Sequence, residues 1–219
     1  LCVIVFLSSA YFVVFLPGVQ IKNIIVSGNQ KISSNDINSV VSGSINKKIL
    51  SLGEWTVNSK SIFLINTGKL NKNILAAFPI IKSVKIDKKY TQTLNVKINE
   101  RTPVAIFCPL PENSQCYFVD NSGIVFEPLV GENENFVIVR SRLSPDGEVA
   151  DSRPAPMAGS EQVDANIDVF VGEKAIQQNI IDLLLKIEKN LKDNFQINLK
   201  EALITSPLRI DVNTSENWK

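Results

Sequence analysis

An uncharged stretch at the start of the chain constrains its architecture more than any other feature. The run LCVIVFLSSAYFVVFL (Leu1–Leu16) contains no charged residue, and Pro17-Gly18 ends it. As a helix this run would span about 24 Å, which is short of the ~30 Å hydrocarbon core of a membrane. The chain also begins without methionine, so we infer that the sequence lacks its true N-terminus and part of this helix.

The apolar run has three competing interpretations. We favour a membrane-spanning anchor formed by residues 1–18, because the run is apolar and uncharged. A cleaved signal peptide fits less well, since no small-x-small cleavage site is evident after the run. A buried helix of a soluble protein is the third interpretation. No second apolar span follows Gly18, and one anchor with a large domain on the far side is therefore the simplest topology.

Composition excludes several classes of function. The chain has 219 residues, 44% of them hydrophobic, which is enough for two modest cores. Its formal net charge of +1 gives no general attraction to nucleic acid. We interpret the one basic cluster, KIDKKY (Lys85–Tyr90), as a solvated strand end. The sequence has no histidine, and it therefore lacks the usual general base of serine and cysteine hydrolases and the commonest metal ligand.

The region 19–100 begins with a β-prone run and a first helix. The run Ile21–Gln30 ends in a Gly-Asn turn. Either Ser33 or Ser34 can then cap the helix, and Gly43 offers a stop. The spacing of the apolar residues predicts one helical face, made of Ile37, Val40 and Val41.

A second helix and two strands complete this region. Pro79 forbids continuation of the helix, and the segments 80–88 and 93–100 alternate apolar and polar residues as strands do. The order strand, helix, helix, strand, strand predicts an α+β unit whose sheet has one face covered by helices and the other in water. The apolar face of the second helix contains Leu70, Ile74, Leu75 and Phe78.

Residues 101–219 are predicted to form a mainly antiparallel β domain with one long helix. Short strands flank the turn at Asn121-Ser122-Gly123, and further strands are expected at 135–141 and in ALITS and LRIDV. The segment 144–166 is dense in Pro, Gly, Ser and acidic residues, and it reads as a flexible insertion. We interpret the apolar helix face as covering a sheet rather than lying on a membrane; it contains Ile176, Ile180, Leu183, Leu184, Ile187 and Leu191.

Two cysteines and one serine–lysine motif are the remaining candidates for chemistry in the sequence. Cys108 and Cys116 flank a turn-rich loop, and a hairpin could bring them close enough for a disulfide, although two reduced cysteines are equally compatible. Ser44–Lys47 form a Ser-x-x-Lys, but no Lys-Thr-Gly accompanies it, and the motif falls after the helix stop expected at Gly43. We therefore predict no enzymatic activity, no cofactor, no metal site and no small-molecule substrate.

The sequence NERTPVAIF marks a joint after the last strand of the first region. Pro103 cannot donate to a strand ladder, so the chain leaves one sheet there and begins a new strand. Glu100 and Arg101 lie at this joint. They could form an exposed ion pair of little energetic value, or a pair that bridges two domains and fixes their angle.

The order of these segments resembles the FtsQ/DivIB family of bitopic bacterial division proteins. The apolar run resembles the family's membrane anchor. Three segments resemble its POTRA domain: IKNIIVSGNQKIS, SIFLINTGKL and FPIIKSVKIDKKYTQTLNVKINERTPVA. The segment YFVDNSGIVF resembles the start of its β domain. Two departures, Ile80 and Tyr90-Thr91, replace residues that are usually aromatic or Trp-Pro. The motif residues in register are Glu100, Arg101, Pro103, Val104, Ala105, Asp120 and Gly123.

The resemblance implies a fold, a location and partners. It implies an anchor at 1–18, a POTRA domain at 19–100 and a β domain at 101–219 that continues past Lys219. The protein would cross the bacterial inner membrane once, with its N-terminus in the cytoplasm and its domains outside, and dock FtsB/FtsL-like and FtsW/FtsI-like division proteins at the septum. The alternative is a POTRA-containing secretion or outer-membrane assembly factor, whose sheet edge would receive client strands.

Overall fold

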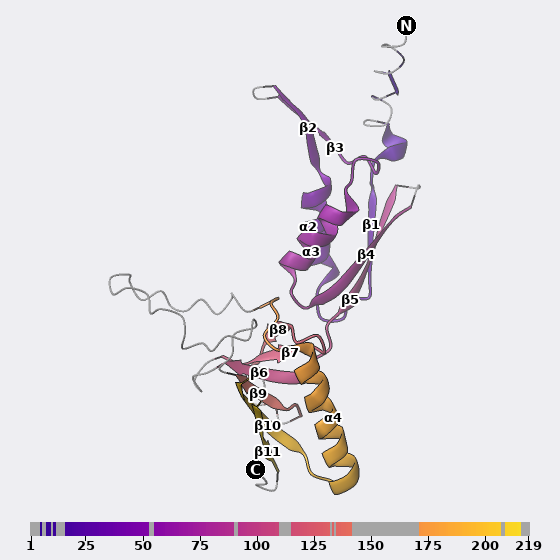
Figure 1. The fold of residues 1–219 in the computed structure, drawn as a ribbon. Helices are drawn as coiled ribbons and strands as arrows, with labels where there is room; N and C mark the ends of the chain where they lie inside the picture. Colours follow the sequence, from indigo (N-terminus) through magenta and orange to yellow (C-terminus); the bar gives the residue numbers. More distant parts are fainter. Residues whose placement is uncertain are drawn as a thin grey trace, which may run out of the picture. The chain divides into compact units, whose positions relative to one another are not determined.

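The structure is a computed structural model in which the chain forms two compact units, Leu1–Glu100 and Arg101–Lys219. It describes residues 5, 8, 9, 11, 16–52, 55–89, 92–109, 115–131, 133, 135–141, 171–206 and 209–215. The insertion at 144–166 and most of the predicted anchor at 1–18 therefore lie outside the described residues. Each unit is considered by itself below (Figure 1).

The first unit is the predicted α+β unit with one addition. Strand β5 is the centre of a three-stranded sheet of order β1-β5-β4, in which β1 is parallel and β4 antiparallel to β5. The hairpin β2–β3 is inserted between the helices, where the sequence predicted only a loop. The elements are a 3₁₀ turn (Pro17–Val19), β1 (Asn23–Ser27), α2 (Ser34–Ile45), β2 (Lys47–Leu52), β3 (Trp55–Ser59), α3 (Thr67–Ala77), β4 (Ile81–Lys89) and β5 (Thr93–Glu100).

Helix α2 begins as expected and ends later than expected. The side chain of Ser33 caps it by accepting a hydrogen bond from the backbone N–H of Asn35 at 3.2 Å. Gly43 was expected to stop the helix, but α2 continues to Ile45. The two residues that α2 adds after Gly43 place Ile45 in the core at 3% exposure, and this burial offsets the low helix propensity of glycine.

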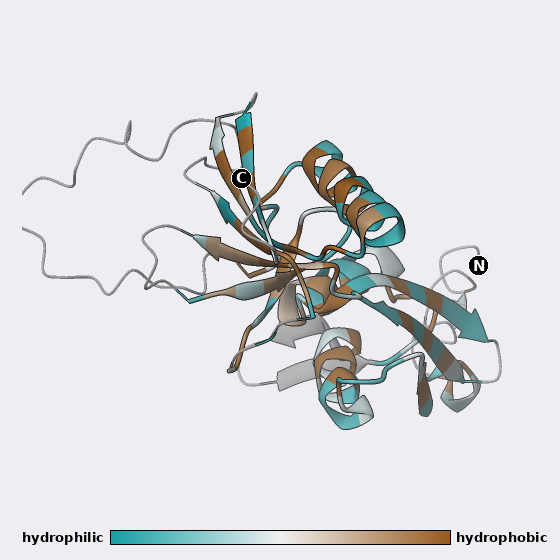
Figure 2. Ribbon diagram, turned by 90° about the horizontal axis from the view of Figure 1, so that it is seen from below, coloured by the Kyte–Doolittle hydropathy of each residue, from teal (hydrophilic) through white to brown (hydrophobic). Residues whose placement is uncertain are grey.

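The core of the first unit lies between the helices and one face of the sheet. Helix α3 is capped by Asn66, whose side-chain oxygen accepts a hydrogen bond from the N–H of Lys69 at 3.0 Å. Figure 2 shows apolar and polar residues alternating along the strands, as expected for a sheet with one covered face. The core residues are Ile21, Ile37, Val41, Ile45, Ile62, Ile65, Leu70, Ile74, Ile81, Val84, Leu94, Val96 and Ile98.

The second unit is a mixed sheet with one helix: three of its five described strand pairings are antiparallel, as predicted, and the two that β9 makes are parallel, which was not predicted. The sheet has the order β11-β10-β9-β6-β7-β8, and β9 is parallel to both β6 and β10. The connection from β9 to β10 contains the helix α4, and a crossover of this kind joins parallel strands. The elements are β6 (Ala105–Pro109), β7 (Tyr117–Val119), β8 (Val125–Pro128), β9 (Ile138–Ser141), α4 (Gln178–Phe195), β10 (Leu199–Ser206) and β11 (Arg209–Thr214).

Helix α4 packs on the hydrophobic core of the second unit, as its pattern predicted. Its core face is centred on Ile181 and Leu184, which are 1% and 3% exposed. Leu183 was assigned to the apolar face but is 47% exposed. It lies about 100° around the helix from Leu184, and this rotation carries it away from the sheet. The striped colouring of α4 in Figure 2 shows this amphipathic character.

Most of the predicted membrane anchor lies outside the described residues. Among them, no helix is both long and apolar enough to cross a membrane.

Candidate functional site

Glu100 is bound within the first unit. Its carboxylate accepts hydrogen bonds from the backbone N–H groups of Gln30 at 2.8 Å, Lys31 at 3.0 Å and Ile32 at 3.2 Å. Burial acts to raise the pKa of Glu100, but these N–H groups and the Lys31 ammonium outweigh it and hold the pKa below its ordinary value. The end of β5 therefore fixes the turn that connects β1 to α2.

Arg101 is bound within the second unit. Its guanidinium donates to Oδ2 of Asp120 at 2.5 Å, and the two side chains are 11% and 1% exposed. The other carboxylate oxygen of Asp120 accepts hydrogen bonds from the backbone N–H groups of Ser122 at 2.9 Å and Ile124 at 3.1 Å. Asp120 is thus a buried charge that one cation and two backbone donors compensate together.

Gly123 closes the turn that Asp120 begins. Its φ of +79° lies in the left-handed region, which side chains other than glycine rarely adopt. A Cβ atom at this position would lie 1.8 Å from the carbonyl oxygen of Ile176. In return, the N–H groups of Ala175 and Ile176 donate to the carbonyl oxygen of Gly123 at 2.8 and 3.2 Å. The turn is therefore held against the segment that leads into α4.

The remaining motif residues start the first strand of the second unit. Pro103 precedes β6, and the N–H of Val104 donates to the carbonyl oxygen of Val119 at 2.9 Å. Ala105 then pairs with Val119 in the β6–β7 ladder. Arg101, Val104, Asp120 and Gly123 are thus brought into one hydrogen-bonded cluster. The sequence predicted an ion pair or a bridge at Glu100-Arg101; the structure instead gives each side chain partners inside its own unit.

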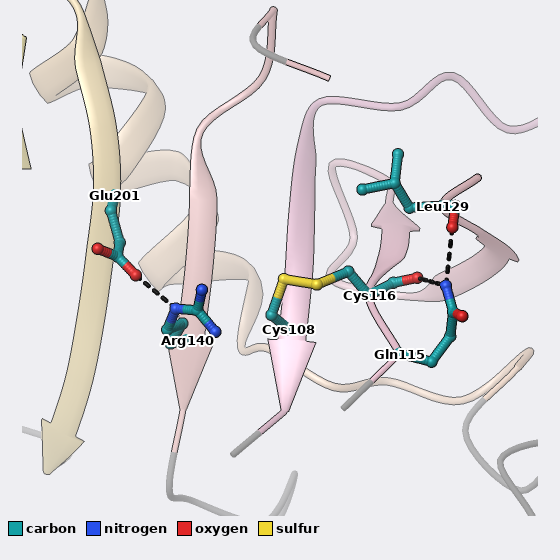
Figure 3. Close-up of a disulfide and its surroundings, with 6 residues drawn as sticks. All are labelled: Cys108, Gln115, Cys116, Leu129, Arg140 and Glu201. Carbon is teal, nitrogen blue, oxygen red and sulfur yellow. Dashed lines mark hydrogen bonds and ion pairs between the residues drawn. A yellow bond between two sulfur atoms is a disulfide. The ribbon is translucent and has the colours of Figure 1, made fainter. Parts of the chain in front are cut away.

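Cys108 and Cys116 form a disulfide, which is one of the two alternatives that the sequence left open. It joins the end of β6 to the residue before β7 (Figure 3). The side chain of Gln115 donates to the backbone carbonyl oxygens of Cys116 at 2.9 Å and Leu129 at 2.8 Å. The end of β6 and the start of β7 are therefore held by a covalent link and by side-chain hydrogen bonds.

A cavity of about 690 Å³ lies beside the disulfide in the second unit. Arg140 lines it from β9, directly across the β6–β9 ladder from Cys108, and its Nε donates to Glu201 on β10 (Figure 3). The Nη1 atom of Arg140 is buried and has no hydrogen-bond partner among the described residues. The sequence gave no signal for this pair, because 61 residues separate its members and only the parallel pairing of β9 with β10 joins them.

Both sheets present edge strands to which another chain could add. In the first unit the edges are β1 and β4, and in the described part of the second unit they are β11 and β8. Exposed lysines along β4 protect that edge from strand addition: Lys82, Lys85, Lys88 and Lys89. Part of β8 is occupied, because Val125 accepts from Gly172 and donates to Glu173. Strand β11 is therefore the candidate docking edge of the second unit.

Neither a catalytic nor a metal arrangement is assembled in the described part of the chain. Ser44 of the Ser-x-x-Lys lies in the last turn of α2, and its hydroxyl oxygen accepts a hydrogen bond from the side chain of Asn73 at 3.1 Å. A serine nucleophile of the penicillin-recognising type would sit at a helix start. Within the described ranges no three His, Cys, Asp or Glu side chains gather as a metal site.

Residues 19–101 match the family model of the POTRA domain, FtsQ-type. The chain therefore contains a POTRA domain of this type, consistent with the resemblance to FtsQ/DivIB proteins. Since POTRA domains are in general non-enzymatic modules that bind other proteins, the domain indicates an interaction scaffold with protein partners. Among solved structures, POTRA1-2 of the periplasmic domain of Omp85 from Anabaena is 9% identical and covers 92% of this chain and 97% of that chain. Its TM-score of 0.26 supports no argument. No curated protein matches the chain.

Proposed function

We propose that the chain is a membrane-anchored, non-catalytic scaffold of the bacterial division machinery. Residues 1–18 would cross the inner membrane once, with the N-terminus in the cytoplasm and both folded units outside the cell membrane at the septum. The observation that carries the proposal is the match of residues 19–101 to the POTRA domain of FtsQ type. The motif residues that follow it support the same assignment.

Two features of the second unit support an extracytoplasmic docking role. The disulfide Cys108–Cys116 suits an oxidising compartment. Strand β11 offers unpaired main-chain groups along one side, and an added strand would gain hydrogen bonds there. The family resemblance implies FtsB/FtsL-like and FtsW/FtsI-like proteins as partners. These partners would be held by main-chain pairing and surface contacts rather than in a substrate pocket.

The proposal is tested by tagging the protein in the bacterium that encodes it. We expect the tagged protein to gather at midcell, its depletion to give filamentous cells, and cross-linking to recover FtsB/FtsL-like proteins. Uniform envelope localisation with recovery of outer-membrane proteins would contradict the proposal, and would favour the alternative of a secretion or assembly factor. Alkaline carbonate extraction tests the anchor separately, since release of a shortened soluble form would show cleavage of the apolar run.

A further inference from the structure

The two units carry opposite net charge, which the overall value of +1 conceals. Residues 19–100 contain twelve lysines and four acidic residues, whereas residues 101–219 contain eleven basic and eighteen acidic residues. The formal charges of these regions are therefore +8 and −7. Exposed charges act over a Debye length of only about 8 Å at physiological ionic strength, so what matters is where the positive charges lie.

The POTRA domain receives the apolar N-terminal run at one defined end. The side chain of Gln92, in the turn between β4 and β5, donates a hydrogen bond to the carbonyl oxygen of Pro17. The carbonyl oxygen of Val19 accepts from the N–H of Ile62 at 2.9 Å. In Figure 1 the 3₁₀ turn, the start of β1, the end of β4 and the start of β5 lie at the same end of this unit. The residues that follow the apolar run are therefore fixed to this end.

Three exposed lysines from distant parts of the sequence meet at this end. Lys22 is the first charged residue after the apolar run, and its N–H donates to the carbonyl oxygen of Gln92 at 2.9 Å. The carbonyl oxygen of Lys60 accepts from the N–H of Ile21 at 3.0 Å. Lys89 ends β4 immediately before the turn that contains Gln92. We call Lys22, Lys60 and Lys89 the basic end of the POTRA domain.

None of the described acidic residues of the domain forms an ion pair with the basic end. Asp36 lies in the first turn of α2, and Glu100 binds the N–H groups of the turn at the opposite end of the sheet. Asp87 is 3.8 Å from the Nζ of Lys85. No carboxylate among the described residues lies within ion-pair distance of the basic end.

We propose that the basic end binds the anionic phospholipid headgroups of the membrane in which residues 1–16 are anchored. This inference rests on the proposed anchor and adds to it an electrostatic contact made by the folded domain. Each lysine close to an anionic bilayer is attracted to it, and the attraction is screened by salt. The acidic second unit is repelled by the same surface, so the contact favours a membrane-proximal POTRA domain.

Lysine footprinting of the full chain in lipid nanodiscs tests the proposal. One set of nanodiscs contains phosphatidylcholine alone, and the other contains phosphatidylglycerol as well. A water-soluble acylating reagent then labels exposed lysine amines, and mass spectrometry measures the labelling of each lysine. We expect labelling of the basic end to fall at least about threefold on the anionic discs and to recover in high salt. Lys69 and Lys72, which are also exposed, serve as internal controls and should not change.

A matched pair of triple variants separates local contact from overall charge. Hydrogen exchange of backbone amides in 20–24 and 92–94 is the readout, and anionic lipid should slow it in the wild type. Anionic lipid should no longer slow this exchange when the three lysines of the basic end are replaced. It should still slow it in a control variant in which three other exposed lysines are replaced, with the same change in total charge. The first variant is Lys22→Glu/Lys60→Glu/Lys89→Glu, and the control is Lys69→Glu/Lys72→Glu/Lys97→Glu.

Several results would overturn the proposal. Equal labelling on both kinds of disc would show that the basic end does not recognise anionic lipid. A uniform fall at all lysines would assign the effect to the net charge of the domain and not to this end. Protection that depends on protein concentration rather than on lipid would indicate that the basic end contacts the acidic unit of a second copy of the chain instead. A chain that does not stay with the nanodisc would contradict the anchor itself, and the lipid contact would fall with it.

Discussion

Replacing Arg101 by alanine is expected to destabilise the second unit by about 3 kcal/mol. Removing one partner of a buried ion pair costs roughly 3–5 kcal/mol, because the other charge stays buried without its counterion. Asp120 is 1% exposed, which places it in this class. Its Oδ1 atom keeps the N–H groups of Ser122 and Ile124, so we take the lower end of the range. The sequence alone suggested that this arginine adjusts a domain angle; the structure predicts that it stabilises a fold.

Hydrogen exchange read by mass spectrometry measures this effect for each unit of the full chain. A loss of about 3 kcal/mol corresponds to roughly 150-fold faster exchange of the most protected amides, since 1.4 kcal/mol is tenfold. We expect this acceleration in β6 and β9 and no change in the strands of the POTRA domain. Arg209→Ala is the matched control, because its ion pair with Asp211 is exposed (71% and 46%) and should contribute less than about 1 kcal/mol.

A double-mutant cycle distinguishes a buried charge from a simple loss of packing. Asp120→Asn keeps an oxygen for the two N–H donors and removes the charge that needs Arg101. The double variant Arg101→Ala/Asp120→Asn should therefore exchange more slowly than Arg101→Ala alone. If Arg101→Ala behaves like the control, or if the second substitution restores nothing, the reasoning from a buried, compensated carboxylate is refuted.

Three further changes follow from the same structure. Gly123→Ala should lower the stability of the second unit by at least about 3 kcal/mol in thermal unfolding, because φ is positive and the new Cβ would overlap a backbone carbonyl oxygen; an unchanged midpoint would contradict this. Glu100 has a lowered pKa, so its contribution to POTRA stability is present above the unfolded pKa of about 4.3 and is lost as the pH falls through the folded value. Unfolding of Glu100→Gln should accordingly depend less on acid than that of the wild type. Reduction of Cys108–Cys116, which are 8 residues apart in sequence, should cost the second unit about 2–3 kcal/mol and leave the POTRA domain unaffected, as separate transitions in calorimetry would show.

Local chemistry could be predicted from the sequence, and long-range pairing could not. The cap at Ser33, the turn at Gly123 and the amphipathic α4 each depend on residues a few positions apart, so periodicity and turn preferences reveal them. The parallel position of β9 depends on a crossover that includes a long insertion. The ion pair between Arg140 and Glu201 depends on the same strand register, so no rule based on sequence spacing predicts it.

The position of the joint could be predicted from the sequence, but the partners of its two charged residues could not. Pro103 and the change of strand pattern marked where one sheet ends. Adjacent opposite charges then suggested that Glu100 and Arg101 pair with each other. Their partners lie 70 and 19 residues away along the chain, at Gln30 and Asp120. The buried carboxylate of Asp120 needs a cation, and Arg101 supplies it within the second unit. The three N–H groups of the turn at Gln30–Ile32 need an acceptor, and Glu100 supplies it within the first unit.

Strand edges and charge together suggest a division of labour between the two units. The lysines that protect β4 from strand addition belong to a domain of net charge +8, which suits contact with an anionic surface. Strand β11 alternates exposed charges of both signs with half-buried apolar residues, so it has no single-sign barrier against a partner strand. On our proposal, the POTRA domain therefore holds the chain close to the membrane while the edge of the second unit stays available to protein partners. If lysines were introduced at alternate positions of β11, partner recovery should fall while the lipid footprint of the basic end stays the same, because the two contacts use different surfaces.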